Sequence, residues 1–211
     1  MRSERRARAV LGLLAAAAVA AGCRARPAEG DAGAVERFQG VRRQAAPPAA
    51  AQSAFCERSY PAGGDGARRW AAPPLRPLPG AQDGAAGAGA WTWVNLWATW
   101  CTPCVEEMEL LGRWREGFSR EGLAVSLELL SVDDADAEKA LVAARAKGLP
   151  GAVRWLRSPD DLPPLLDALG VDRSAAIPIH ALVDPAGWLR CVRVGAIHEQ
   201  DWAAAKALVA R

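Results

Sequence analysis

Large apolar residues follow two different periods along the second half of the chain, and the two periods predict strands and helices. The run 91–97, WTWVNLW, is almost continuously apolar and is typical of a buried strand. The segment 105–118 instead repeats its large side chains at helical spacing, so we expect a helix that reaches about Ser119. A strand that leads directly into a helix is therefore the first unit of the fold.

The same reasoning predicts the rest of the architecture. An extended segment with four prolines spans 68–80. Beyond the first strand and helix we expect a strand at 123–132, a helix at 133–147, a short strand at 153–156, a helix at 158–169, two strands at 179–183 and 189–194 around the turn 184–187, and a closing helix at 199–210. This order predicts an α/β fold in which helices flank a central mixed β-sheet.

The N-terminal 23 residues have the pattern of a secretory signal. Four arginines precede an apolar stretch at 9–21 that is too short for a comfortable membrane span. Small residues lead into Cys23, as in a bacterial lipobox, where the cysteine is lipidated; Ala20 stands where a lipobox prefers Leu or Val. An ordinary cleaved signal or an uncleaved anchor, with Cys23 incidental, are the alternatives. A lipidated Cys23, a cleaved signal and an uncleaved anchor all predict an extracytoplasmic, periplasmic protein. The lipidated cysteine and the uncleaved anchor also predict that the protein is membrane-anchored.

The charge of the chain gives no argument for nucleic acid or an anionic membrane surface as a partner, and we expect no nucleic acid. The formal net charge is +2, but residues 1–23 carry four arginines and one glutamate, so the remainder carries −1. Residues 24–54 are rich in Ala, Pro, Gly, Arg and Gln, which predicts a disordered tether before a single domain at 55–211.

Two cysteines, Cys101 and Cys104, lie where the first strand turns into the first helix. The free N–H groups and the dipole at a helix start stabilise a thiolate, which is the species that attacks disulfides. A structural zinc site needs four ligands, and the remaining cysteines and the only two histidines are scattered along the chain. The pair therefore indicates redox chemistry.

The sequence resembles the TlpA/ResA/CcmG-like extracytoplasmic thiol–disulfide oxidoreductases, which have a thioredoxin-like fold. Residues 95–104, NLWATWCTPC, are close to the N-F-W-A-T-W-C-x-P-C motif of that group, and the following EEM at 106–108 matches as well. The segment 177–184 resembles its I-P-x-x-x-x-x-D stretch, and 134–170 matches its helical insert. Two departures stand out: Glu109 replaces a usual proline, which predicts a weaker helix kink, and His180 replaces a small hydroxyl residue.

This resemblance implies roles for the residues around the pair. Cys101 would attack a disulfide and Cys104 would resolve the mixed disulfide. Glu107, on the helix face of Cys104, would shuttle protons, or would simply be an acid favoured in a first helical turn. Asn95 stands where thioredoxins carry a buried Asp; an amide cannot take a proton, so we expect a hydrogen-bonding core residue.

The resemblance also implies a substrate-binding surface. Pro178 would follow a cis peptide bond, which leaves the backbone of Ile177 free to pair with an extended partner chain. Trp100 would pack beside the redox turn and contact the partner.

Cys56 and Cys191 remain after the redox pair and Cys23 are assigned. In an oxidising compartment they can form a structural disulfide, as in some members of the group; two free thiols, or a regulatory thiol at Cys56, are the alternatives.

We therefore expect a membrane-tethered, monomeric thiol–disulfide oxidoreductase without a cofactor that reduces protein disulfides through Cys101 and Cys104. A membrane donor of the DsbD/CcdA type would recharge it, and apocytochrome c or copper-site assembly cysteines would be its substrates. An oxidase direction remains open. The alternative from another class is a copper-binding chaperone that uses Cys101, Cys104 and His180.

Overall fold

The computed structural model describes residues 55–80 and 89–211. The predicted signal at 1–23 with Cys23, and the predicted tether at 24–54, lie outside the described residues. Within the described part, no helix has the length and apolar character needed to cross a membrane.

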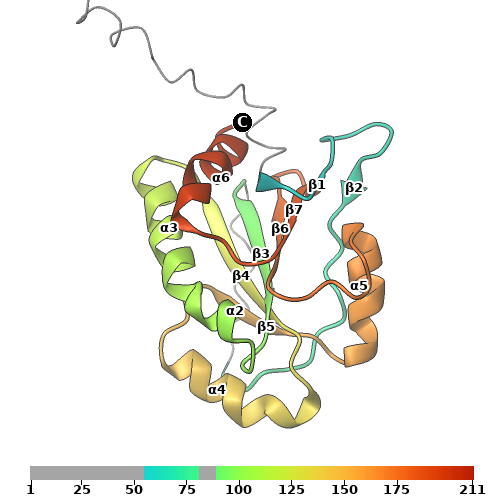
Figure 1. Ribbon diagram of the computed structural model, residues 1–211, viewed down its shortest axis with the longest axis vertical. Helices are drawn as coiled ribbons and strands as arrows, with labels where there is room; N and C mark the ends of the chain where they lie inside the picture. The colour runs from blue at the N-terminus through green and yellow to red at the C-terminus, as the bar shows by residue number, and fades with distance from the viewer. Residues whose placement is uncertain (1–54, 81–88) are drawn as a thin grey trace, which may run out of the picture. The chain divides into compact units, whose positions relative to one another are not determined.

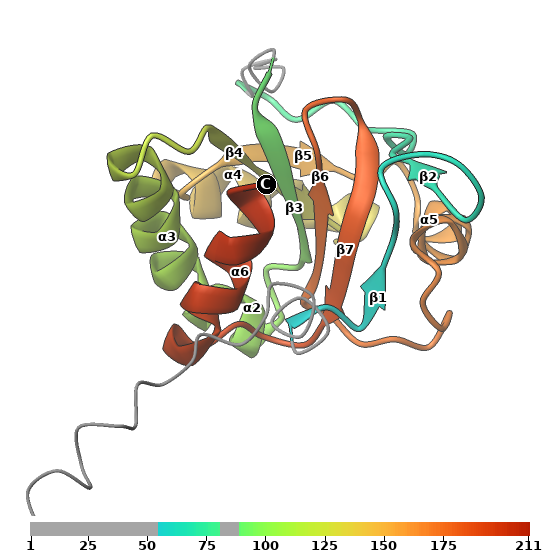
Figure 2. The ribbon, with the colours of Figure 1, turned by 90° about the horizontal axis from the view of Figure 1, so that it is seen from above.

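A mixed sheet forms the centre of the domain, and β3 (Trp91–Trp97) lies in its middle. On one side β3 pairs in parallel with β4 (Val125–Ser131), which pairs in parallel with β5 (Ala152–Trp155). On the other side it pairs antiparallel with β6 (Ile179–Val183), which forms a hairpin with β7 (Trp188–Val194) (Figures 1 and 2). The predicted core strands are therefore all present.

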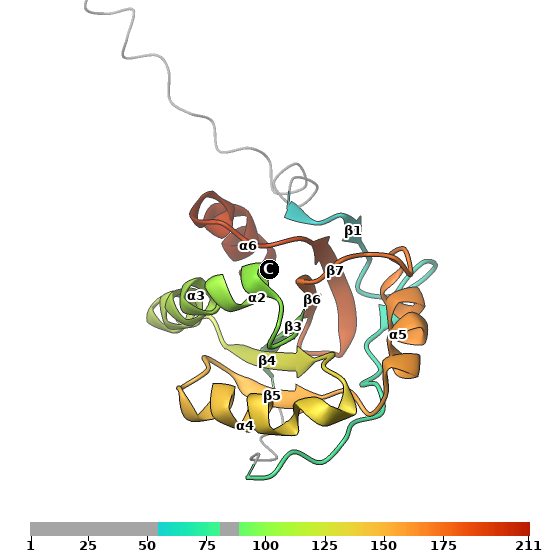
Figure 3. The same cartoon turned by 60° about the horizontal axis from the view of Figure 1, so that its bottom comes forward.

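Helices cover both faces of this sheet (Figures 2 and 3). The described helices are α2 (Thr102–Glu106), α3 (Met108–Arg120), α4 (Glu138–Ala146), α5 (Leu162–Leu169) and α6 (Trp202–Val209), with single 3₁₀ turns at Ala135–Ala137, Pro159–Asp161 and Glu199–Asp201. Alternate residues of β3 face opposite ways: Trp93 packs with α3 and α6, whereas Val94 packs with α5. The predicted thioredoxin-like α/β fold is confirmed, and its predicted insert at 134–170 contains α4, β5 and α5.

The helix after the redox pair differs from the sequence-based expectation. It begins at Thr102 and is divided at Glu107 into α2 and α3, although no proline follows. The expected weaker kink stays a prediction. Glu109 points into solvent and pairs with Arg113 at 2.8 Å, while the Glu107 side chain turns inward. Hydrogen bonds to Glu107 from other elements accompany the division.

Two short strands, β1 (Arg58–Ser59) and β2 (Arg68–Arg69), pair with β7 and were not predicted. A segment of two residues is too short to show an apolar period, so each of these strands is defined only by its pairing with β7.

Candidate active site

The redox turn places both cysteines at the start of α2. Cys101 is the N-cap, and its Sγ accepts a hydrogen bond from the Cys104 backbone N–H at 3.3 Å. The two residues form a disulfide with a Cα–Cα distance of 5.3 Å. Cys101 is 5% exposed and Cys104 is fully buried, so Cys101 is the more accessible residue of the two.

A cis peptide bond between Ile177 and Pro178 lies against this turn. The Cys101 Sγ is 3.8 Å from the carbonyl oxygen of Ile177. The segment before β6 thus borders the Cys101 sulfur.

Apolar side chains surround the turn on the solvent side. Trp100 is 69% exposed and Val105 is 49% exposed, which is unusual for large apolar residues in a domain with a well-packed core. A groove of about 430 Å³, which Val105 helps to line, lies between the redox helix and α4. Its lining includes Trp97, Thr99, Val105, Met108, Ala140 and Ala144.

A buried carboxylate fixes the backbone just before the turn. Asp133, at the end of β4, is 2% exposed and accepts from the Thr99 N–H at 3.0 and 3.1 Å and from the Thr99 hydroxyl at 2.7 Å. The Ser131 hydroxyl donates to it as well, at 2.7 Å. Because Thr99 is two residues before Cys101, these bonds position the redox turn. Sequence reasoning missed Asp133 because it read this residue as a helix start.

Glu107 lies at the centre of a buried polar network. Its carboxylate accepts from Asn95 Nδ2 at 2.8 Å and from the Ile197 N–H at 2.9 Å. The residue is 4% exposed and Asn95 is fully buried. Asn95 is a hydrogen-bonding core residue, and it also anchors the Glu107 side chain.

His180 belongs to the same network. Its Nδ1 accepts from the Trp93 indole N–H at 3.1 Å and lies 3.3 Å from Asn95 Nδ2, and its Nε2 is 3.4 Å from Glu107 Oε2. Nδ1 is thus engaged by Trp93, while Nε2 faces Glu107 without a hydrogen bond. Across residues 55–80 and 89–211, no group of three His, Cys, Asp or Glu side chains is arranged to hold a metal ion.

Cys56 and Cys191 form a second disulfide, which joins the start of the described chain to β7. Both residues are buried. Next to this bond, Phe55 packs edge-on against Trp93, with ring centroids 6.0 Å apart, and the Arg193 guanidinium lies 5.0 Å from the centre of the Phe55 ring.

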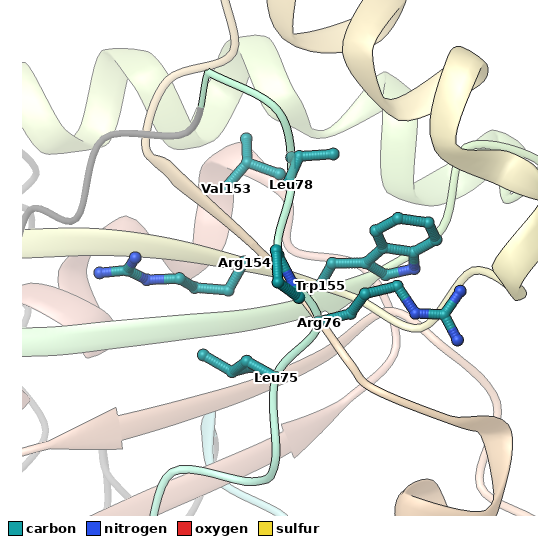
Figure 4. A pocket seen from close by; sticks show the side chains of 7 residues that line it. Leu75, Arg76, Leu78, Val153, Arg154 and Trp155 are labelled. Carbon is teal, nitrogen blue, oxygen red and sulfur yellow. The ribbon is translucent and has the colours of Figure 1, made fainter.

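Another cavity, of about 330 Å³, lies at the edge of the sheet beside β5 (Figure 4). Arg76 stacks over Trp155 there, 4.6 Å from the ring centre, and Leu75 forms a bridge to Leu156. None of the residues that line it belongs to the redox turn or the cis-proline segment.

No protein-family model matches the sequence, and no curated protein matches it. Solved structures do match. A thiol-disulfide isomerase from Corynebacterium glutamicum is 18% identical, covers 65% of this chain and 97% of its own, and has a TM-score of 0.49. The thioredoxin domain of a thiol-disulfide oxidoreductase from Bacteroides vulgatus is 19% identical over 58% and 81%, with a TM-score of 0.44. StoA from Bacillus subtilis is 18% identical over 56% and 84%, with a TM-score of 0.42.

These matches are similarities of fold at low sequence identity. Two of the three structures are of thiol-disulfide proteins. The chemistry of this chain therefore rests on its own geometry: a cysteine pair at a helix start, in disulfide form, against a cis-proline segment.

Proposed function

We propose that the protein is a thiol–disulfide oxidoreductase that reduces disulfides of extracytoplasmic partner proteins. The observation that carries the proposal is the Cys101–Cys104 disulfide at the N-terminus of α2, with the Cys101 sulfur beside the Ile177 carbonyl and flanked by exposed Trp100. A stable structural disulfide would not need an exposed apolar rim.

The exchange begins from the reduced form. The Cys101 thiolate, stabilised by the helix start and the Cys104 N–H, attacks one sulfur of a partner disulfide, and the other partner sulfur leaves as a thiolate. The Cys104 thiol then loses its proton and attacks the Cys101 sulfur. The ring closes, the second partner sulfur leaves, and two electrons have passed to the partner.

Glu107 is the group we assign to receive the Cys104 proton. It lies three residues after Cys104, on the same side of the redox helix, and its side chain is buried. Ile177 and Trp100 contact the partner chain, and Pro178 shapes the segment that presents the Ile177 backbone.

Recharging requires an external dithiol. A membrane donor of the DsbD/CcdA type would return two electrons to the Cys101–Cys104 ring, and the N-terminal signal segment with Cys23 would hold the domain at the membrane. Apocytochrome c thiols and copper-site cysteines are the client classes that we propose.

The test uses the full chain with Cys104 or Cys101 replaced by serine. Cys104→Ser leaves the attacking thiol without its resolving partner, so it should accumulate a mixed disulfide with a disulfide-bonded protein. Cys101→Ser should form none. Mass spectrometry after alkylation distinguishes the two adducts.

The reduction potential of the Cys101–Cys104 pair sets the direction. A value near or below that of thioredoxin, about −270 mV, supports a reductase, whereas a value near −120 mV reverses the direction. A Cys104→Ser variant that traps no partner would sink the proposal.

A further inference from the structure

The groove of about 430 Å³ beside the redox helix joins the redox turn to the helix of the insert. Thr99 lies two residues before Cys101, and Val105 directly follows Cys104, so the lining includes residues on both sides of the cysteine pair in the sequence. We name this space the α2–α4 groove; it is lined by Trp97, Thr99, Val105, Met108, Ala140, Ala143, Ala144, Lys147 and Leu149.

Small side chains on α4 keep this groove open. Ala140 lies three and four positions before Ala143 and Ala144, so the three alanines share one face of the helix. Longer side chains at these positions would fill the space opposite Val105 and Met108. Val105 is half exposed, whereas most large apolar residues of the described part are buried. The α2–α4 groove therefore offers an apolar surface that matches a large apolar side chain.

The groove runs from the redox turn toward α3. Asp133 binds Thr99, and the chain then enters α4 at Glu138. Beyond the end of α4, the Pro150 carbonyl oxygen accepts a hydrogen bond from Arg115 of α3. The start of α4 thus lies toward the redox turn, and its end lies beside α3.

A single unpaired charge lies at the end of the groove away from the redox turn. Among the lining residues Lys147 alone is charged, and no residue of 55–80 or 89–211 forms an ion pair or a side-chain hydrogen bond with it. Arg115 adds a second positive charge at this end. A carboxylate from a partner is therefore complementary to this end of the groove, and an ammonium group is repelled from it.

The distance between the two features sets a spacing in the partner. Ala140 and Lys147 are separated by about 10 Å along the helix axis, because each residue of an α-helix rises about 1.5 Å. An extended chain covers that distance in about three residues. An apolar side chain at the start of the groove and a carboxylate at Lys147 thus belong to positions about three residues apart.

We infer that the α2–α4 groove binds the segment of the partner protein beside its reacting cysteine. A large apolar side chain of that segment lies against Val105 and the alanines of α4, and an acidic side chain about three residues farther pairs with Lys147. The inference rests on the proposed dithiol exchange, to which it adds a sequence preference for the disulfide that is attacked.

The test measures how fast Cys101 attacks peptide disulfides in the full chain carrying Cys104→Ser. Each peptide cysteine is linked to thionitrobenzoate; the Cys101 thiolate attacks the peptide sulfur, and thionitrobenzoate leaves as a coloured thiolate. One peptide has Leu beside the cysteine and Glu three residues beyond it, and two others replace that Leu by Ala or that Glu by Lys. Each sequence is made on either side of the cysteine, and every rate is divided by that for the 2-mercaptoethanol disulfide of thionitrobenzoate.

We expect the Leu–Glu peptide to react about tenfold faster than the Ala–Glu peptide, because its leucine leaves water on entering the groove. It should react about threefold faster than the Leu–Lys peptide, the range of an exposed ion pair, and this preference should shrink in high salt. Equal rates for the three peptides overturn the inference.

Variants on α4 assign these preferences to the groove. Ala143→Leu fills the groove and should abolish the preference for Leu over Ala, whereas Ala146→Leu, at an exposed position of α4 outside the lining, should keep it. Lys147→Glu should reverse the preference between Glu and Lys, and Lys139→Glu, at another exposed position of α4, should not. Preferences that persist in Ala143→Leu and Lys147→Glu overturn the inference.

A binding measurement separates the groove from the redox chemistry. The Leu–Glu peptide with serine in place of cysteine is added to nitrogen-15-labelled protein, and the amide signals of Ala140, Ala143 and Lys147 should shift more than with the Ala–Lys peptide. Identical shifts for the two peptides overturn the inference. If Cys101 does not attack even the 2-mercaptoethanol disulfide, the proposed function fails, and these shifts still decide whether the groove binds the segment.

Discussion

Asp133 shows how one buried side chain can set the geometry of a reactive turn from a distance in sequence. Its two oxygens receive bonds from Thr99 and Ser131, so the backbone before Cys101 is fastened to the end of β4. A charged acceptor of this kind stabilises the turn more than a neutral one would, because its hydrogen bonds are stronger.

We predict that Asp133→Asn lowers the free energy of unfolding by about 2 kcal/mol, since an amide has only one acceptor oxygen and no charge. Urea unfolding measures the change. Asp134→Asn, at the exposed neighbouring position, is the matched control and should change the stability little. Equal losses in both variants would contradict the assignment.

Glu128 on β4 illustrates the cost of burying a charge. Burial raises the pKa of Glu128 above its ordinary value, and Arg154, 3.8 Å away, offsets only part of that rise. The folded state therefore binds the proton more tightly than the unfolded state. Stability due to this group is fully present below the unfolded pKa and is lost as the pH rises through the folded pKa.

We predict that Glu128→Gln unfolds like the wild type near pH 4 but is more stable than it at pH 7. Urea unfolding at both pH values checks the sign. Glu116→Gln, at a 64% exposed position on α3, should show no such pH-dependent gain.

At the scale of elements, α3 and α6 approach each other closely at one glycine of α3. A Cβ on Gly117 would lie 2.8 Å from the Trp202 ring, which is itself held against Trp114 and Phe118. The ring has little room to move, because both neighbours are buried.

We predict that Gly117→Ala destabilises the fold by about 1–3 kcal/mol through overpacking. Gly112→Ala, one turn and a half earlier on the same helix, meets only Pro150 at 3.4 Å and should gain up to about 1 kcal/mol from helix propensity. Thermal unfolding of the two variants provides the comparison. A loss of stability in both variants would mean that another effect on α3 outweighs helix propensity at Gly112.

Local sequence patterns predicted the elements well, and long-range pairings account for what they missed. The run 91–97 and the cysteine turn are local, so period and motif sufficed to locate them. The contact of Asn95 with His180 arises because β3 and β6 pair in register across 85 residues of chain. No pattern within either strand encodes that pairing, so the Glu107 network emerged only in three dimensions.

At the scale of the whole molecule, the Cys56–Cys191 disulfide spans 135 residues and encloses the sheet core and the redox turn. A cross-link over a loop of that length removes much of the entropy of the unfolded chain, about 5 kcal/mol in the loop-closure treatment.

We predict that Cys56→Ala combined with Cys191→Ala loses stability of that order, as measured by denaturant unfolding under oxidising conditions. Cys101→Ser combined with Cys104→Ser removes a cross-link between residues only three positions apart. This double variant should lose much less stability. Similar losses for the two pairs would show that strain or packing, rather than loop length, decides the effect.

The same bond also determines how the domain bears mechanical load. A pull applied to the chain before Cys56 passes through a covalent link directly into β7, a strand bonded to β1, β2 and β6. The N-terminal edge therefore cannot be peeled away strand by strand while the bond is intact. A force applied at Cys56 is therefore carried first by β7 and the strands bonded to it.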